Sequence, residues 1–235
     1  MIDLNKKTFL IIAPHPDDEV IGCGGLISKI KSLGGKVFVL YLTVGTTQDF
    51  GKRGVSTAEA RINEIKKVTK FLKIDGWKIA FPGGEFHLQL DSLPQKKLIH
   101  EIERGEKISL ETLKPDIIAF PSVGDYNQDH QAASSAAFSA CRPSTKQDKF
   151  VPNLILSYEA PMNQWTQEAH RINFFVQLDK KDFAKKTAAL DLYKSQVRRA
   201  PHLRSRAVLE ALAKLRGSVA GTNLAEGFYC HKLNT

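Results

Sequence analysis

Two short stretches of this sequence hold the residue types that carry out hydrolytic chemistry. His15, Asp17, Asp18 and Glu19 lie within five positions in the segment HPDDE, and His130 closes the segment DYNQDH. Two imidazoles and one carboxylate with an open fourth position match a catalytic zinc site. Such a site activates water and polarises a carbonyl group. Read alone, HPDDE is also compatible with a solvated turn, a helix cap or a phosphate-binding loop.

The elements around these segments indicate how they could meet. Apolar runs alternate with stretches of helical spacing, which predicts βαβ units and an α/β fold with an open, mostly parallel, Rossmann-like three-layer sheet. The predicted strands cover residues 9–14, 36–44, 77–81, 116–122 and 153–161, and the predicted helices cover residues 24–33, 57–72, 93–103 and 129–142. HPDDE follows the first of these strands and DYNQDH follows the fourth. Ligands of a parallel sheet bind outside the carboxyl ends of its strands, so we expect His15, Asp18 and His130 to converge there.

The last third of the chain has a different pattern. A strand runs into an amphipathic helix over residues 174–196, and another helix is predicted over residues 205–217. No linker, repeat or low-complexity tract interrupts the sequence. We therefore expect one domain over residues 1–235, with a parallel α/β core at 1–165 and a C-terminal α/β elaboration at 166–235.

Charge and composition narrow the class of protein. The net charge of +9 comes from 34 basic and 25 acidic residues, and the basic residues are dispersed along the chain. Nothing resembles a basic recognition helix, a zinc finger or an aromatic-studded RNA-binding strand, which argues against a nucleic-acid partner. Arg204 belongs to the densest basic cluster and is a candidate for binding an anionic ligand.

The expected compartment is the cytoplasm. Three cysteines, an odd number without a CxxC pair, are typical of reduced thiols. No apolar run approaches the roughly 18 residues that a membrane span requires. The first residues have too short an apolar core for a signal peptide.

Two carboxylates next to the expected ligands have predicted roles of their own. Asp17 is adjacent to a ligand but points elsewhere, so it could act as the general base for the attacking water. Asp129 could orient a ligand histidine by accepting a hydrogen bond from it. Glu19 is expected to support the loop from behind. The glycines that follow, GCGG, are not a G-x-G-x-x-G motif and precede no phosphate-loop lysine, so we expect them to allow close packing of a helix.

PHPDDEVIGCGG resembles the (A/P)-H-P-D-D-E-x4-GG signature of the PIG-L/LmbE-like zinc-dependent N-deacetylases. R-x-x-E at Arg61, KPDIIAFPSVGDYNQDH, LDLYKSQ and RGSVAGTNLAEGF follow in the family's order over nearly the whole chain. The resemblance implies that His15, Asp18 and His130 bind zinc and that Asp17 is the base. It implies attack of the activated water on the N-acetyl group of an amino sugar or its glycoconjugate, releasing acetate and an amine. The ligand set suits Fe²⁺ as well as Zn²⁺.

One position departs from the family pattern. Many members have a second histidine three residues before the ligand histidine, and this chain has Asn127 there. Asparagine can donate a hydrogen bond to an oxyanion, but it cannot donate a proton to the leaving amine. We predict that His202, in RRAPHLRSR, supplies the missing acid; the alternative is a surface histidine in a capping loop.

Three residues are predicted to bind the substrate. By resemblance, Arg61 faces the site, whereas the plain alternative is an ion pair with Glu64 on the same helix. Asp91 could bind sugar hydroxyls or cap a helix. Arg204 could pair with a phosphate.

The sequence therefore predicts a metal-dependent de-N-acetylase of an N-acetylated amino sugar. The alternatives are an amidase of the same mechanism that acts on another acyl-amine, and a non-catalytic binding protein with the same fold. The oligomeric state stays open, a homo-oligomer included.

Overall fold

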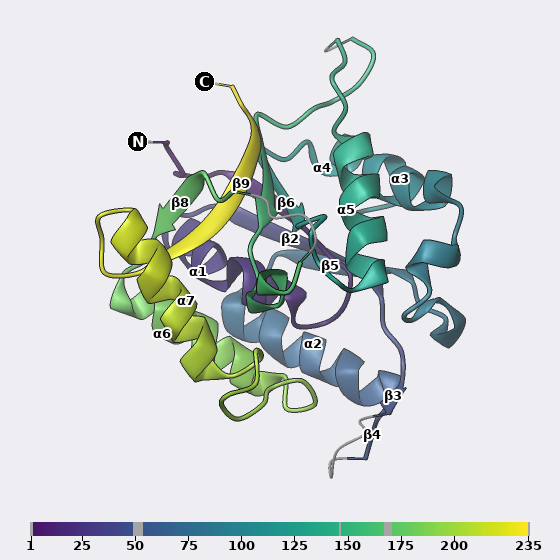
Figure 1. The fold of residues 1–235 in the computed structure, drawn as a ribbon. Helices are drawn as coiled ribbons and strands as arrows, with labels where there is room; N and C mark the ends of the chain where they lie inside the picture. The colour runs from purple at the N-terminus through teal and green to yellow at the C-terminus, as the bar shows by residue number, and fades with distance from the viewer. Residues whose placement is uncertain (1, 49–53, 146, 167–170, 235) are drawn as a thin grey trace.

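The computed structural model describes residues 2–48, 54–145, 147–166 and 171–234. Its main sheet contains β1 (Thr8–Ala13), β2 (Lys36–Thr43), β5 (Gly76–Phe81), β6 (Ile117–Pro121), β7 (Leu154–Tyr158), β8 (Phe174–Gln177) and β9 (Ala225–Leu233). The strand order is β5-β2-β1-β6-β7-β9-β8 (Figure 1). The first five of these strands are parallel, and β9 runs antiparallel to both of its neighbours. The predicted α/β fold with a mostly parallel sheet is confirmed.

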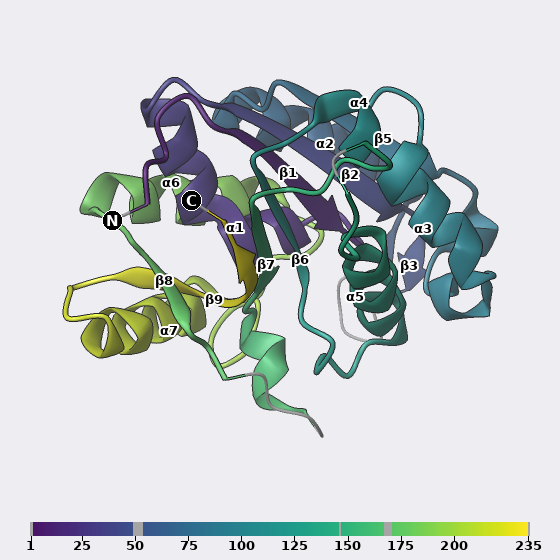
Figure 2. The same cartoon turned by 90° about the horizontal axis from the view of Figure 1, so that it is seen from above.

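Helices cover both faces of this sheet and form the outer layers (Figure 2). One apolar cluster packs the sheet against α1 (Asp18–Ser32), α2 (Ala58–Leu72) and α6 (Lys180–Leu192). A second cluster, on the opposite face, includes α3 (Gln95–Arg104), α4 (Leu110–Leu113) and α5 (Gln128–Ala140). The remaining helix, α7 (Arg206–Val219), contacts β8 and β9. Short elements complete the chain: β3 (Thr47–Gln48), β4 (Val55–Ser56), and the 3-10 turns η1 (Gly84–Phe86), η2 (Leu90–Ser92) and η3 (Pro161–Gln164).

The central strand β1 shows why an apolar run without polar alternation forms a strand here. Phe9 and Ile11 belong to the first cluster, and Leu10 and Ile12 belong to the second. All four side chains are fully buried because both faces of the strand are covered. None of the helices in the described ranges is long and apolar enough to cross a membrane.

The topology brings the two motifs to one edge of the sheet. β1 pairs in parallel with β2 on one side and with β6 on the other, so the strand order reverses direction at β1. The loops that leave β1 and β6 therefore share the carboxyl edge at a topological switch point, where ligands bind in such folds. The parallel pairing of β1 with β6 is what brings HPDDE and DYNQDH close together.

Two features differ from the sequence predictions. Helix α1 begins at Asp18, not at residue 24, so part of the charged motif forms its first turn. The long strand β9 was not predicted; it lies between β7 and β8, and the sheet thus continues from the expected core into the expected elaboration.

Candidate metal and active site

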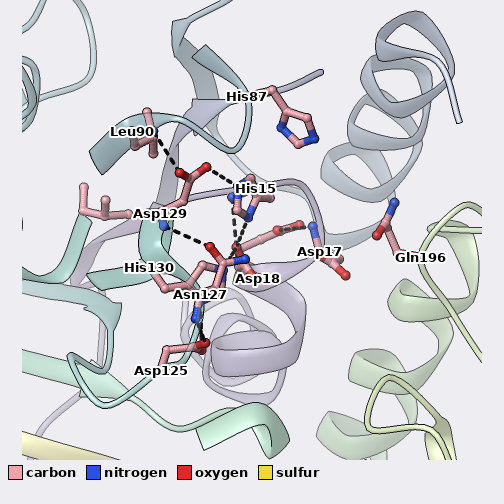
Figure 3. Close-up of polar contacts among 12 residues, drawn as sticks. His15, Asp17, Asp18, His87, Leu90, Asp125, Asn127, Asp129, His130 and Gln196 are labelled. Carbon is pink, nitrogen blue, oxygen red and sulfur yellow. Dashed lines mark hydrogen bonds and ion pairs between the residues drawn. The ribbon is translucent and has the colours of Figure 1, made fainter. Parts of the chain in front are cut away.

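Three predicted ligands converge at the carboxyl ends of β1 and β6. His15 follows β1, Asp18 opens α1 and His130 lies in the first turn of α5. Each offers a ligand atom, and these atoms lie within 4.8 Å of one another. All three side chains are buried (Figure 3). The structure thus joins residues that are more than a hundred positions apart in the sequence.

His15 is oriented by the carboxylate that the sequence nominated for this task. Its Nε2 lies 2.8 Å from Oδ2 of Asp129, and the other oxygen of Asp129 accepts the amide of Leu90 at 2.8 Å. Asp129 is fully buried, and each of its two carboxylate oxygens has one of these partners. Nδ1 of His15 remains to face Asp18, whose Oδ2 is 3.6 Å away.

His130 is oriented by a carboxylate that the sequence analysis did not single out. Its Nδ1 lies 2.9 Å from Oδ2 of Asp125, the first residue of DYNQDH, and Asn163 donates to the same oxygen at 3.1 Å. Nε2 of His130 lies 3.2 Å from Oδ2 of Asp18. The signal was in the D-x-N-x-D-H motif, whose first Asp lies five positions before His130 and just outside α5.

The charges in this cluster are strongly coupled. Burial alone would raise the pKa of Asp18. The opposing effect of His130 and His15 is larger, so the pKa lies well below its usual range. Burial lowers the pKa of His130, whereas Asp18 and Asp125 raise it to about 10.

These residues fit a divalent metal. Nε2 of His130 is buried and has no hydrogen-bond partner, as expected of an atom that ligates. Each histidine is held through its other ring nitrogen by a carboxylate, the arrangement that fixes the tautomer of metal-bound imidazoles. Two neutral imidazole nitrogens and one carboxylate suit zinc or ferrous iron.

Asp17 is the N-cap of α1, yet its side chain does not cap the helix. Its backbone has φ of 109°, a left-handed conformation, and its carboxylate makes no capping hydrogen bond. The side chain is 1% exposed, and neither of its oxygens has a hydrogen-bond partner. Backbone strain of this kind is common at functional sites.

Burial raises the pKa of Asp17 to about 6, although Arg204 lowers it. Nε of Arg204 lies 3.5 Å from Oδ2 of Asp17, so this arginine is next to the proposed base, and its predicted contact with a phosphate stays a prediction. A carboxylate with such a pKa is ionised at neutral pH and can accept a proton.

Glu19 contacts both the loop that carries Asp17 and the C-terminal part of the chain. Its Oε2 accepts the amide of Asp17 at 3.2 Å, and its Oε1 accepts the hydroxyl of Tyr193 at 2.6 Å. The side chain is fully buried, and burial raises its pKa to about 8.

Arg61 faces the site region and not its helical neighbour. Its Nη1 donates to the carbonyl of Gly45 at 3.2 Å and to Oγ1 of Thr47 at 3.1 Å. Glu64 instead accepts the amide and hydroxyl of Ser195. The two side chains therefore have separate partners, which favours the interpretation taken from the family resemblance over an intrahelical ion pair.

Asn127 is the N-cap of α5. Its Oδ1 accepts the amide of Asp129 at 2.9 Å, so the Nδ2 amine is the end that can donate to another group. Figure 3 shows its side chain next to Asp18 and His130, with the dashed line from the Asp129 amide to its oxygen.

Two predicted site residues lie outside the buried cluster. Asp91 is exposed in η2, and the N-cap of α3 is Pro94, so Asp91 does not cap that helix. His202 is also exposed, and its Nδ1 accepts the amide of Arg204 at 3.0 Å. The roles predicted for Asp91 and His202 stay predictions.

The sequence analysis missed His87, which follows η1. Its ring lies edge-on to that of His15, with centroids 5.4 Å apart. Nε2 of His87 lies 3.1 Å from Nη1 of Arg61 and 2.9 Å from Oγ1 of Thr47. Burial, then His15 and Arg61, lower its pKa to about 4. A single histidine in a glycine-rich loop gave no sequence signal of this placement.

Comparisons with known proteins agree with this geometry. The chain is 27% identical over 198 residues to the "Uncharacterized deacetylase YaiS" of Escherichia coli, covering 81% of this chain and 92% of the relative. The structure resembles the N,N'-diacetylchitobiose deacetylase of Pyrococcus horikoshii, with a TM-score of 0.68 and 20% identity over 95% of this chain and 83% of the other. It also resembles GalB, the 4-carboxy-2-hydroxymuconate hydratase of Pseudomonas putida, with a TM-score of 0.74 and 20% identity over 97% and 98% of the two chains.

The two solved structures establish the fold alone, since they serve different reactions at low sequence identity. The family match is more specific. The model of the PIG-L family, described as GlcNAc-PI de-N-acetylase, matches residues 10–141, which include HPDDE and DYNQDH and more than half of the chain. The chain therefore belongs to the PIG-L family of deacetylases.

Proposed function

We propose that this protein is a metal-dependent hydrolase that removes the N-acetyl group from an N-acetylated amino sugar or its conjugate. The observation that carries the proposal is the buried cluster of His15, Asp18 and His130, together with the adjacent buried carboxylate of Asp17, which has an ion-pair partner in Arg204 but no hydrogen-bond partner among the described residues. The chemistry of this donor set favours zinc, with ferrous iron as the alternative.

A metal ion held by the three ligands would polarise the amide carbonyl and lower the pKa of water. Asp17 takes the proton of the attacking water, since its pKa of about 6 leaves it ionised at neutral pH. Arg204 stabilises that ionised form from 3.5 Å. The Nδ2 amine of Asn127 is a hydrogen-bond donor for the oxyanion, because its Oδ1 is occupied by the helix cap.

The proton for the leaving amine is assigned to His202. What supports this assignment is that His202 is exposed and its Nδ1 accepts the amide of Arg204, the residue whose side chain lies beside Asp17. The test is the pH–rate profile of His202→Ala beside that of Asn127→Ala. Loss of the basic limb in the His202 variant alone supports the assignment, and an unchanged limb removes it.

The proposed substrate class is supported by the family match. An acetylated amino sugar is supported by the likeness to the diacetylchitobiose deacetylase, and Arg61, Arg204 and Asp91 are the residues proposed to hold its hydroxyl or anionic groups. An anionic substituent is favoured by the two arginines near Asp17.

The deciding experiment measures metal content and acetate release together. Purified protein is assayed for zinc and iron, then incubated with N-acetylglucosamine, its β-1,4-linked dimer, its 1-phosphate and a nucleotide-linked form. Acetate release that requires the metal and is lost in Asp17→Asn supports the proposal. Metal-replete protein that hydrolyses only other acyl-amines indicates the amidase alternative. If no amide is hydrolysed but an unsaturated acid is hydrated, the activity resembles that of GalB. If neither reaction occurs, the chain is a binding protein.

A further inference from the structure

In this chain Asn127 replaces the usual histidine, and His87 brings another imidazole to the site, where it contacts the proposed ligand His15. We propose that His87 contacts the substrate and donates a hydrogen bond from Nδ1 to the acyl oxygen of the amide. This inference rests on the proposed function, because the acyl group belongs to that substrate.

The tautomer of His87 follows from its neighbours. The guanidinium of Arg61 has only donors, so we assign the His87 Nε2 atom, which lies 3.1 Å from its Nη1, as an acceptor. Oγ1 of Thr47, 2.9 Å from the same nitrogen, accepts from Arg61 and can donate to His87. A neutral imidazole whose Nε2 accepts carries its hydrogen on Nδ1. The geometry therefore presents Nδ1–H as a donor.

The ring is fixed on several sides. A Cβ atom added to Gly45 would lie 2.3 Å from Cβ of His87, so only glycine at that position allows this approach. Arg61 and Thr47 hold one ring edge, and His15 packs against the ring with centroids 5.4 Å apart. His87 is 9% exposed, which leaves it little freedom to change rotamer. Such preorganisation is what a donor to a transition state requires.

The remaining nitrogen, Nδ1 of His87, is buried and has no hydrogen-bond partner among the residues that the structure describes. The same is true of both oxygens of Asp17 and of Nε2 of His130 at the site, and also of Nε of Arg61 and the hydroxyls of Thr43 and Ser56. Asp17, the proposed base, and His130, a proposed ligand, thus resemble His87 in having buried polar atoms without a hydrogen bond. Buried polar atoms are nearly always paired, so a group of unpaired atoms around one site indicates partners that a ligand supplies.

The acceptor is the acyl oxygen because of where His87 stands. His87 contacts His15, one of the residues that would hold the metal (Figure 3). A metal held there would polarise the acyl carbonyl, which makes its oxygen the acceptor that we assign to Nδ1. Nδ1 of His87 then supplies, beside Asn127, the hydrogen bond that the family's missing histidine would give.

Two variants test the roles of the two ring nitrogens of His87 separately. In His87→Asn the side-chain amide can place a donor where Nδ1 stands, whereas in His87→Gln the amide reaches the position of Nε2 and keeps the contacts to Arg61 and Thr47. We expect His87→Gln to lower kcat about 10²–10³-fold with KM nearly unchanged, and His87→Asn to retain most of kcat. His100→Asn, at an exposed histidine of α3, is the matched control and should match the wild type.

Metal content and melting temperature are measured for each variant. Equal kcat losses in both His87 variants, or a raised KM with retained kcat, would overturn the assignment to the acyl oxygen. Loss of metal in both variants would show that His87 only holds His15 in position, and this result also overturns the proposal.

A spectroscopic readout does not depend on turnover. In protein labelled with ¹⁵N-histidine, Nδ1 of His87 should show a protonated, pyrrole-type shift and Nε2 an unprotonated one, and added acetate should move the Nδ1–H resonance of zinc-loaded protein. The opposite tautomer, or no response to acetate, overturns the inference. If the wild type releases no acetate from any N-acetyl sugar, the proposed function fails while this measurement still decides the role of His87.

Discussion

Asp17 combines burial, missing hydrogen bonds and a left-handed backbone, each of which costs stability. Its φ of 109° and its two unpartnered oxygens have no structural benefit within the protein. Strain of about 1–3 kcal/mol is typical of such backbone positions, and it persists where function requires it. Asn also tolerates a positive φ, so Asp17→Asn removes the charge without changing the backbone requirement.

We expect Asp17→Asn to lose about 10²–10⁴-fold in kcat, since a general base contributes roughly that factor. Its metal content should equal that of the wild type, and its melting temperature should not fall, because a buried charge is replaced by a neutral amide. Acetate release, metal analysis and calorimetry measure the three quantities. Loss of the metal together with activity would instead make Asp17 a ligand.

The pH dependence of activity tests the pairing of Arg204 with Asp17. Asp17 must be ionised to accept a proton, so activity is lost as the pH falls through its pKa of about 6. Arg204 lowers that pKa, and Arg204→Met should therefore move the acid limb of kcat/KM to higher pH. Arg206→Met, at an exposed arginine two residues further, is the control and should leave the limb in place. An unmoved limb in the Arg204 variant would separate this residue from the base.

At the scale of elements, α1 carries the site because another part of the chain packs closely against it. Cβ atoms added to Gly24 and Gly25 would lie 2.8 Å from Lys186 of α6 and 2.5 Å from Leu178. Glu226 of β9 accepts the amides of Gly25 and Leu26 at 2.7 Å each. The glycines of the signature thus allow α6 and β9 to hold the helix that presents the ligand.

Gly25→Ala should lower the free energy of unfolding by about 1–3 kcal/mol, the usual cost of overpacking a core. The gain in helix propensity, about 1 kcal/mol, is too small to offset contacts as short as 2.5 Å to Leu178. Gly84→Ala is the control, because its added Cβ would meet nothing within 4 Å, and its stability should stay within about 0.5 kcal/mol. Urea unfolding of both variants gives the comparison, and equal stabilities would contradict the packing argument.

The buried pair of Lys186 and Glu226 gives a second prediction at this scale. Nζ of Lys186 lies 2.7 Å from Oε1 of Glu226, and both side chains are nearly inaccessible. Lys186→Met should destabilise the protein by about 3–5 kcal/mol, because it leaves a buried carboxylate without its cation. The double variant with Glu226→Gln should recover part of this loss in urea unfolding; full additivity of the two changes would show that the pair is not coupled.

The strands and helices that carry the two motifs could be predicted from the sequence. Features that depend on contacts between distant parts of the chain could not. The strand before HPDDE is a purely apolar run, and parallel topology alone then joins His15 to His130. Strand β9 has a mixed pattern, AEGFYCHKL, and only its neighbours β7 and β8 make it a strand. Likewise, the environment of His87 is set by Gly45, Thr47 and Arg61, whose meeting no local spacing encodes.

For the whole molecule, the candidate site connects units that are far apart along the chain. His15 and Asp18 come from the N-terminal strand and helix, whereas His130 comes from α5 on the opposite face of the sheet. A metal that binds all three residues binds the folded chain only, so it stabilises the fold by mass action. At a free concentration about 1,000 times Kd the gain is about 4 kcal/mol.

Removing the metal should therefore lower the melting temperature, and adding zinc should restore it. In the metal-free protein the pKa of His130 is about 10, so metal binding must displace its proton, and affinity should rise with pH. Calorimetry in buffers of different protonation enthalpy should show proton release near pH 7. Asp18→Asn should reduce the thermal shift with zinc strongly, while Asp91→Asn, an exposed carboxylate outside the cluster, should keep it. A shift that survives in Asp18→Asn would place the metal elsewhere in the molecule, because the three-ligand geometry depends on that carboxylate.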